Sequence, residues 1–474
     1  MASMPLLPSI AVGQLRRRPA AFVGLATALF LAIATVTLFG SLFAADLTTP
    51  ADARKAAAGP GLMVIAGAFA EIAVLVALFV VVNALGFALR QQHRELALLR
   101  TVAATPRQAR RLVRGQVVAL TLLVAAPGWA VGAAAARGFL AALQRRGMAA
   151  PGVRVPGTPV PMLIALAVAL VVGLAASAVA ARRISRIAPA AARTASATEH
   201  GRTGALRLLA GIGALVGGGL LLRLAATRPA EQSDKAGQAA LLGSLVLLVA
   251  VGLAGPLAAR VLAALLGTPV RAVAPATGWL ADANLRGYAR RLSSAVVPVA
   301  LLVGLSGTMS IMTRTAEYAA SVAATVTGTD TAAATASGVA SGTDVWLRQA
   351  ELTLLVCFTA ISTVNTLVAV TADRRREFAM LRLAGATRSQ LLRMLATEAV
   401  LTTAVGVLLG AAVAGAASAA FSTAVTGSAV PAVPVAACWW IVAGAATLTI
   451  PGILATGLWA VRGPATEAVG GDRD

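Results

Sequence analysis

The chain has 474 residues, of which 58% are hydrophobic and only 12% are charged. Soluble domains are about a quarter charged, so this composition is typical of a membrane protein. The net charge of +22 comes almost wholly from arginine, since Lys55 and Lys235 are the only lysines. A nucleic-acid-binding protein would gather such charge on a soluble face. Here the charge lies in short clusters between long apolar runs, which excludes that class.

Ten apolar segments are long enough to cross a bilayer as helices, which requires about 20 residues. The first follows Arg16–Arg18 and resembles a signal peptide, but its apolar run exceeds the core of such a peptide, so we expect it to be retained as a span. The sequence therefore predicts an all-α polytopic membrane protein with about ten transmembrane helices. The predicted spans cover residues 20–45, 62–89, 113–136, 159–181, 206–224, 238–266, 294–312, 350–372, 395–423 and 435–460.

The distribution of basic residues predicts the orientation of these spans. With a cytoplasmic N-terminus, 29 of the 40 Lys and Arg residues lie in inner segments and 11 lie in outer segments. Basic residues favour the cytoplasmic side of a membrane, so we expect both termini to be cytoplasmic. Trp439 and Trp440 then fall at the outer end of the last span, where tryptophan is typical of an interfacial anchor, although simple lipid-facing packing explains them equally well.

A basic segment of the sequence occurs twice, 282 positions apart. RELALLRTVAATPRQARR begins at Arg94 and REFAMLRLAGATRSQLLR begins at Arg376, and 8 of the 17 positions from Glu95 to Arg111 are identical without a gap. We therefore expect two homologous four-span units, 1–190 and 270–465. A linker and an extra two-span hairpin, 191–269, would separate them, and a tail, 466–474, would follow. Both copies come after the second span of their unit, so the repeats are parallel and not inverted as in many carriers.

Each copy predicts two helices joined by a tight corner. Thr105-Pro106-Arg107-Gln108 and Thr387-Arg388-Ser389-Gln390 both place a threonine three residues before a glutamine, which is the pattern of a helix-starting capping box. Gly385 lets the backbone turn just before the second of these helices, where the first copy has Ala103. The sequence therefore predicts a short helix, a corner and a second helix that continues into the next span.

The helix before each corner combines charged residues with apolar ones, among them Leu99, Phe378 and Leu381. An apolar stripe with charged edges is suited to docking into a cleft of a cytosolic partner. The alternative is that both segments lie against anionic lipid headgroups. Arginine alone fits that alternative, but the matched Glu95 and Glu377 do not, because anionic lipids would not require an acid at a fixed spacing. We favour partner docking.

Few polar residues within the spans are candidates for a catalytic or binding site. Asn83 and Asn365 occupy equivalent depths in the second and eighth spans, and we expect them to form an interhelical hydrogen bond at the contact between the units in preference to binding a substrate. The sequence shows no catalytic spacing of Ser-His-Asp, Cys-His or paired carboxylates. The isolated His93 and His200 and the two cysteines predict no metal site. We expect the chain by itself not to be an enzyme.

The segment RRREFAMLRLAGATRSQLLRMLATEAVL, from Arg374 to Leu401, resembles the signature of the FtsX-like permease family. This family comprises membrane subunits of mechanotransmission-type ABC transporters and includes the macrolide exporter MacB and the bacitracin-resistance permeases. The resemblance covers both units and is stronger in the second. A ten-span chain with two such units is most similar to the bacitracin-resistance type. The excess of arginine over lysine suits a high-GC bacterial genome, so the resemblance implies a bacterial cell membrane.

The resemblance implies that each basic segment holds a coupling helix in a groove of a cytosolic ABC ATPase, with two ATPase subunits per permease. Ala103 in place of the usual glycine, and Pro106 after the cap, put equal coupling by the two halves in doubt. The chain has no GxxxxGK[ST] phosphate loop, so ATP should be bound and hydrolysed by the partner, and the chain itself needs no cofactor. The residues carried over are Arg94, Glu95, Arg100, Thr105 and Gln108 in the first copy, and Arg376, Glu377, Arg382, Gly385, Thr387 and Gln390 in the second.

The implied function is export or membrane extraction of a hydrophobic, antibiotic-like or lipid-like substrate. One alternative is a non-transporting signal relay of the FtsX cell-division type, which the short outer loops disfavour; the longest covers only residues 313–349. Another is an ATP-independent carrier. The parallel repeat, and the lack of a network of ion pairs within the spans, disfavour it.

Overall fold

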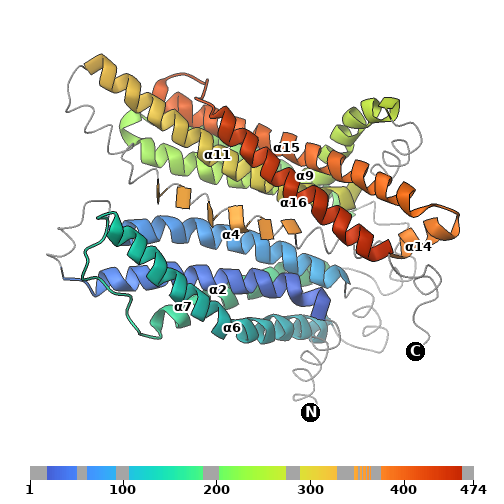
Figure 1. The fold of residues 1–474 in the computed structure, drawn as a ribbon, viewed down its shortest axis with the longest axis horizontal. Coiled ribbons are helices and arrows are strands. Elements are labelled where there is room, and N and C mark those ends of the chain that lie inside the picture. Colours follow the sequence, from blue (N-terminus) through green and yellow to red (C-terminus); the bar gives the residue numbers. More distant parts are fainter. Residues whose placement is uncertain are drawn as a thin grey trace, which may run out of the picture. The chain divides into compact units, whose positions relative to one another are not determined.

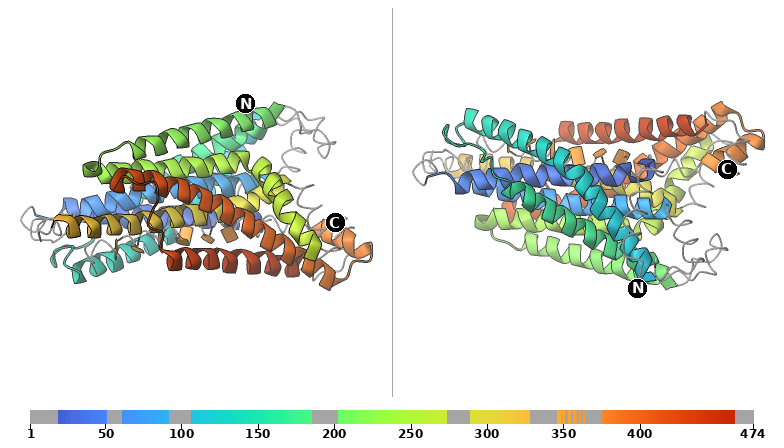
Figure 2. Two further views of the ribbon diagram at one scale, coloured as in Figure 1. Left: turned by 90° about the horizontal axis from the view of Figure 1, so that it is seen from above. Right: turned by 90° about the horizontal axis from the view of Figure 1, so that it is seen from below.

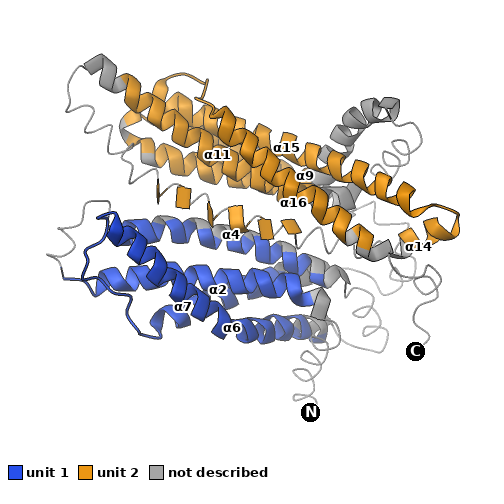
Figure 3. Ribbon diagram, in the orientation of Figure 1, with its two compact units in different colours: residues 1–198 blue, residues 199–474 orange. Residues whose placement is uncertain are grey.

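The computed structural model describes residues 19–50, 61–91, 106–184, 202–273, 289–327 and 375–461, and separate positions between 346 and 364. Within these residues all regular structure is helical (Figure 1). The chain divides into two compact units, Met1–Thr198 and Glu199–Asp474 (Figure 3). Unit 1 contains α2 (Pro19–Leu47), α4 (Leu62–Gln91), α6 (Pro106–Arg145) and α7 (Val160–Ile184). Unit 2 contains α8 (Arg202–Ala226), the 3₁₀ turn η2 (Ala230–Gln232), α9 (Ser233–Val273), α11 (Ala289–Thr327), α14 (Arg375–Leu383), α15 (Arg388–Thr426) and α16 (Val435–Val461).

Eight helices of the described residues are long and apolar enough to cross a membrane, which confirms the prediction of an all-α polytopic membrane protein. They coincide with eight of the ten predicted spans. The second predicted span, 62–89, lies within the continuous helix α4. The eighth, 350–372, is described only at separate positions, which are helical. The eight stretches are Phe22–Leu47, Arg111–Arg145, Val160–Ala178, Leu208–Ala226, Lys235–Ala254, Val296–Val322, Arg388–Thr426 and Val435–Ala455.

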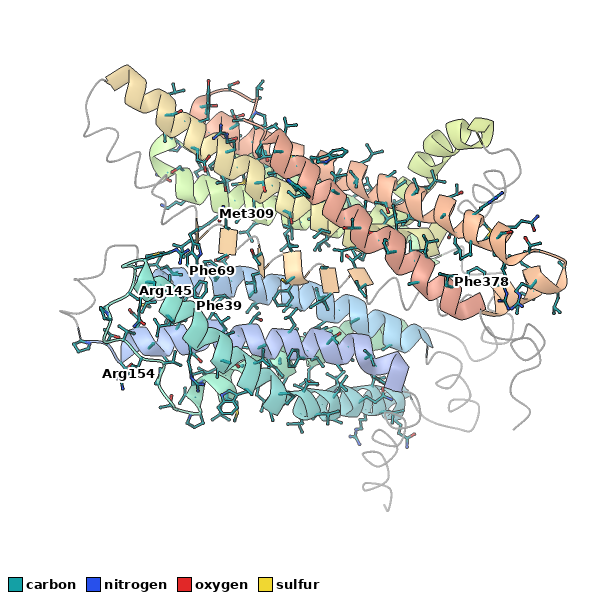
Figure 4. All side chains as sticks on the ribbon, in the orientation of Figure 1. Phe39, Phe69, Arg145, Arg154, Met309 and Phe378 are labelled. Atoms are coloured by element: carbon teal, nitrogen blue, oxygen red, sulfur yellow. The ribbon has the colours of Figure 1, made fainter. Side chains whose placement is uncertain are left out.

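In unit 1, α2 is the central helix and packs against α4, α6 and α7. It buries apolar side chains along its length, including Leu25, Leu29 and Ile33. Near the end of α6, Phe39 of α2, Phe69 of α4 and Phe139 of α6 form a cluster in which each ring contacts the other two (Figure 4 labels Phe39 and Phe69). The ring centroids of Phe39 and Phe69 are 5.3 Å apart, and Phe139 meets these rings edge to face at 6.3 and 5.7 Å. Edge-to-face contacts add to the burial of the rings themselves.

In unit 2, α11 and α15 form the core pair, and the extra hairpin of α8 and α9 packs on it mainly through α9, while α8 also contacts α15 (Figure 2). Leucines fill the space above glycines in these contacts. If Gly218 of α8 carried a Cβ, that atom would lie only 2.8 Å from Leu247 Cγ of α9. A Cβ on Gly304 of α11 would likewise lie 3.0 Å from Leu248 Cδ2 of α9. The hairpin is therefore packed into the second unit.

The contact of α8 with α9 uses Gly218 and not Gly213. Gly213 and Gly217 have the spacing of a helix-packing motif, but nothing lies within 4 Å of a Cβ on Gly213. The face of α8 that meets α9 is therefore not the one that this spacing alone would select. In α15, by contrast, the same spacing at Gly406 and Gly410 does face α11.

The internal repeat recurs in the packing of the helices. α6 begins at Pro106 and α15 begins at Arg388, which are 282 positions apart. A Cβ on Gly128 of α6 would meet Ile33 and the Phe30 carbonyl, and one on Gly410 of α15 would meet Val303 and the Ala300 carbonyl. On the first helix of each unit, Ile33 corresponds to Val303 and Phe30 corresponds to Ala300, and the members of both pairs are 270 positions apart. The first and third spans therefore cross at equivalent residues within each unit. Because the offset is 282 positions for the third spans but 270 for the first spans, the loop after the first span is longer in unit 2.

Candidate functional site

The corner after α14 is closed by backbone hydrogen bonds that end the helix. The Ala386 N–H donates to the Leu381 carbonyl (3.0 Å), and the Gly385 N–H donates to the Arg382 carbonyl (3.1 Å). This pair of bonds is the Schellman motif, in which the first of the two donor residues adopts a left-handed conformation. Gly385 supplies it with φ +96°, a value that side chains disfavour. The predicted turn at Gly385 is therefore present, and it reverses the chain sharply between α14 and α15.

The predicted capping box starts α15. The Gln390 N–H donates to Thr387 Oγ1 (3.3 Å), and the Thr387 N–H donates to Gln390 Oε1 (2.9 Å). Thr387 has extended backbone angles, φ −77° and ψ 157°. Two amide groups that a helix start leaves unsatisfied thus receive partners. We call the segment Arg375–Gln390, that is α14, the corner and the first turn of α15, the elbow.

One face of α14 is buried in its own unit, contrary to the expectation that Phe378 and Leu381 form the docking stripe. Phe378 is fully buried among Leu391, Leu395 and other residues of α15, and Ile453 of α16 (Figure 4). Leu381 packs against the same cluster. The sequence could not distinguish a stripe that meets a partner from one that meets the last span of the same unit. The predicted apolar stripe therefore holds the elbow in place and is not available to a partner.

The opposite face of α14 exposes two large apolar side chains. Met380 is 51% exposed and Leu383 is 56% exposed. The exposed polar residues Arg388, Ser389 and Gln390 of the first turn of α15 follow them around the corner. Residues 380 and 383 share a face because they are three apart, but the sequence analysis did not single them out. The elbow thus presents an apolar pair with a basic and polar border.

The structure describes only some of the other predicted site residues. Arg382 and Thr387 lie on the elbow, Arg382 half-buried and Thr387 exposed. The backbone of Arg376 and Glu377 belongs to α14. In the first copy, α6 begins at Pro106, as the cap predicts, and Gln108 is exposed in its first turn. Outside the described residues are Arg94, Glu95, Arg100, Thr105 and Asn365, as are the side chains of Asn83, Arg376 and Glu377.

The interhelical hydrogen bond between Asn83 and Asn365 stays a prediction, since neither side chain is described. The same holds for the roles of Glu95 and Glu377. Within the described part of the chain, no three His, Cys, Asp or Glu side chains lie close enough together to hold a metal ion.

Removing the cap of α15 should loosen the elbow. Thr387→Ala deletes the acceptor of the Gln390 amide and should cost about 1 kcal/mol of local stability. We expect faster hydrogen–deuterium exchange at residues 388–391. Thr397→Ala is the matched control, because Thr397 only donates to the Arg393 carbonyl within the same helix. Equal exchange at 388–391 in both variants would contradict the role of the cap.

A family model described as FtsX-like permease C-terminal matches the chain twice, at residues 67–189 and 351–463. Each matched region contains one copy of the basic segment and the two spans that follow it. The second region includes the whole elbow. None of the curated proteins matches the chain.

Proposed function

Because the chain belongs to the FtsX-like permease family, and is thus a membrane subunit of the ABC-transporter type, we propose that it exports or extracts a hydrophobic, antibiotic-like or lipid-like molecule from the membrane. The family works with an ATPase in a separate cytosolic partner. ATP is bound and hydrolysed in that partner, and the chain itself carries no cofactor. Two ATPase subunits serve one permease, one for each copy of the basic segment.

The elbow carries this proposal. Its exposed pair, Met380 and Leu383, is an apolar surface at the end of a helix that also bears Arg382. Apolar anchors within a polar border are the usual pattern at the centre of a protein–protein interface. The buried face with Phe378 fixes the orientation of that surface relative to α15 and α16. A partner that moves the elbow would therefore move these two helices with it.

The helix after the elbow supports transmission through the membrane. α15 has 39 residues without a break, which corresponds to about 58 Å at 1.5 Å per residue. Its contact with α11 is close, since a Cβ on Gly410 would lie 2.8 Å from both the Ala300 carbonyl oxygen and Val303 Cβ. Helices in such close contact move together. A displacement of the elbow would therefore reach the far end of both helices.

The orientation in the proposal follows the basic residues. Both termini and both basic segments face the cytoplasm of a bacterial cell, and the loops between α6 and α7 and between α15 and α16 face outward. In this orientation, ATP-driven closure of two ATPase subunits on the two basic segments moves the two four-span units relative to one another. Expulsion of a substrate from the bilayer follows from that movement.

Charging the exposed pair of the elbow tests the proposal. Met380→Asp/Leu383→Asp leaves the buried cluster of Phe378 intact but places two acids on the docking surface. We expect a loss of at least about 2 kcal/mol of binding, or roughly 30-fold weaker association, as for the loss of an interface anchor. The measurement is copurification with the coexpressed cytosolic ATPase, together with the rate of ATP hydrolysis by the complex.

The matched control is the swap Met380→Leu/Leu383→Met, which keeps both side chains apolar and nearly unchanged in volume. It should copurify with the ATPase as the wild type does. If the acidic double variant also copurifies and supports ATP hydrolysis at the normal rate, this face of α14 is not the contact with the ATPase.

A further inference from the structure

The two loops at the ends of α6 and α15, far from the basic segments, are both held by side chains from the preceding helix. In unit 1, Gln144 Nε2 donates to the carbonyls of Ala150 (3.1 Å) and Val153 (2.9 Å). In unit 2, Ser422 Oγ donates to the Val430 carbonyl (3.1 Å). Each loop therefore has a defined backbone, and the side chains that it presents are set by that backbone.

The loop of unit 2 has a second attachment. The Ala432 N–H donates to Thr315 Oγ1 of α11 (3.1 Å), and Thr315 is almost fully buried. Gly427 ends α15 in the left-handed conformation, with φ 72°, and Pro431 and Pro434 restrict the residues that follow. The loop is thus bonded to α11 and α15 and continues directly into α16, so its shape is coupled to three helices.

The two loops expose opposite kinds of side chain. In unit 1, Met148 and Val153 are buried, while Arg145 and Arg154 are exposed (Figure 4 labels both arginines). In unit 2, the loop and the first turns of α16 expose apolar side chains instead. We call these residues the Val–Trp segment: Val430, Val433, Val435, Trp439 and Trp440, which are 79%, 50%, 76%, 70% and 74% exposed.

No charge accompanies this apolar surface. The sequence between Glu398 and Arg462 contains no Asp, Glu, Lys, Arg or His, whereas the loop of unit 1 and its borders hold three arginines, at positions 145, 146 and 154. A soluble partner would be expected to meet a surface with a polar border. A fixed, uncharged, exposed apolar segment at the end of a span instead fits the interfacial region of a bilayer.

The length of α16 places the Val–Trp segment at the depth of the bilayer interface. From Val435 to Val461 the helix has 27 residues, or about 40 Å at 1.5 Å per residue, which nearly equals the roughly 40–45 Å of a bilayer with its headgroups. Arg462 follows α16 in the sequence, and its charge favours the headgroup region of one leaflet. The start of α16 then reaches the other headgroup region, and Trp439 and Trp440 lie about one turn inside it, at the level that tryptophan prefers.

We propose that the Val–Trp segment is a lipid-binding surface that inserts into the bilayer interface at the end of unit 2 opposite the elbow. Its partner is the glycerol and upper acyl region of the phospholipids in that leaflet. Because Thr315 and Ser422 bond the loop to α11 and α15, the lipid contact holds the ends of α11, α15 and α16 at one depth. The exposed arginines of the unit 1 loop suit water instead. This inference does not depend on the identity of the ATPase or of the substrate.

Spin labels test the depth of the loop. Val430→Cys and Val433→Cys, each in a variant lacking the natural Cys357 and Cys438, are labelled and reconstituted into phosphatidylcholine vesicles. Oxygen concentrates in lipid, whereas a nickel chelate stays in water. We expect a higher ratio of oxygen to nickel collisions at positions 430 and 433 than at the matched control Arg154→Cys in the loop of unit 1. If the ratio at 430 and 433 is as low as at 154, the segment faces water and is a surface for a protein, and the proposal is wrong.

Tryptophan fluorescence gives an independent test without new cysteines. A variant that keeps Trp439 and Trp440 and has phenylalanine at the other four tryptophans is reconstituted into vesicles of phosphatidylcholine brominated near the headgroup end of the acyl chains. We expect a loss of emission relative to unbrominated lipid and little quenching by aqueous iodide. Strong quenching by iodide with unchanged emission in brominated lipid would overturn the proposal.

Discussion

Phe378→Ala is expected to release α14 from the rest of unit 2. Phe378 is fully buried against Leu391, Leu395 and Ile453, and removing a buried phenylalanine side chain costs about 3–5 kcal/mol. α14 has only nine residues, too few to stay helical without packing. Hydrogen–deuterium exchange at residues 375–386 should therefore become at least about a hundredfold faster, since each 1.4 kcal/mol corresponds to a factor of ten. ATP hydrolysis by the coexpressed ATPase should lose its dependence on the permease.

The control for this variant lies on the other face of the same helix. Met380→Ala removes a side chain of similar size that is half-exposed, so exchange across α14 should stay close to that of the wild type. The two variants thus separate the buried and exposed faces of the elbow. Unchanged protection of α14 in Phe378→Ala would mean that the cluster around Phe378 does not hold the elbow.

Gly410→Ala is expected to lower the stability of unit 2 by forcing α11 and α15 apart. The new Cβ would lie 2.8 Å from the Ala300 carbonyl oxygen and 2.9 Å from the Gly304 nitrogen. Both are backbone atoms, which cannot turn away as a flexible side chain can. Overpacking of this kind costs about 1–3 kcal/mol, which outweighs a gain in helix propensity of up to about 1 kcal/mol. The measurement is the temperature at which detergent-purified protein loses its monodisperse peak in size-exclusion chromatography.

Gly415→Ala on the same helix provides the comparison for this variant. Nothing lies within 4 Å of a Cβ at position 415, so this change should keep or slightly raise the unfolding temperature. A lower temperature for Gly410→Ala alone identifies the α11–α15 contact as the cause. Equal temperatures for both variants would show that the two helices can separate without cost, and the proposed transmission along α15 would lose its basis.

Local chemistry explains why the sequence predicts the elbow well. The capping box of Thr387 and Gln390 and the turn at Gly385 depend on residues within a few positions of one another. Their backbone geometry follows from hydrogen bonds that each helix end needs, whatever surrounds it. The spans follow for a similar reason, since the length and apolarity of a segment suffice to identify a helix that can cross a bilayer.

The faces of these helices could not be assigned in the same way. Phe378 and Leu381 form one apolar stripe of α14, and Met380 and Leu383 form another, so the sequence offers two candidates for docking. The packing of α14 against α15 and against Ile453 of α16, which lies more than seventy residues later, buries the first stripe and leaves the second exposed. The same problem separates Gly213 from Gly218 in α8, because a rotation of one residue changes which glycine meets the neighbouring helix.

The sequence by itself determined the membrane class of the chain, its helical spans, the repeat of its basic segment and the local form of the elbow. Each of these depends on composition, on segment length or on contacts between near neighbours along the chain. The tertiary structure alone decided which side of α14 is exposed, that the α8–α9 hairpin packs on α11 and α15, and that the loop before α16 exposes valines where its counterpart exposes arginines. These features depend on contacts between distant segments, and in a chain so rich in small apolar residues many such contacts are equally compatible with the pattern of a single helix.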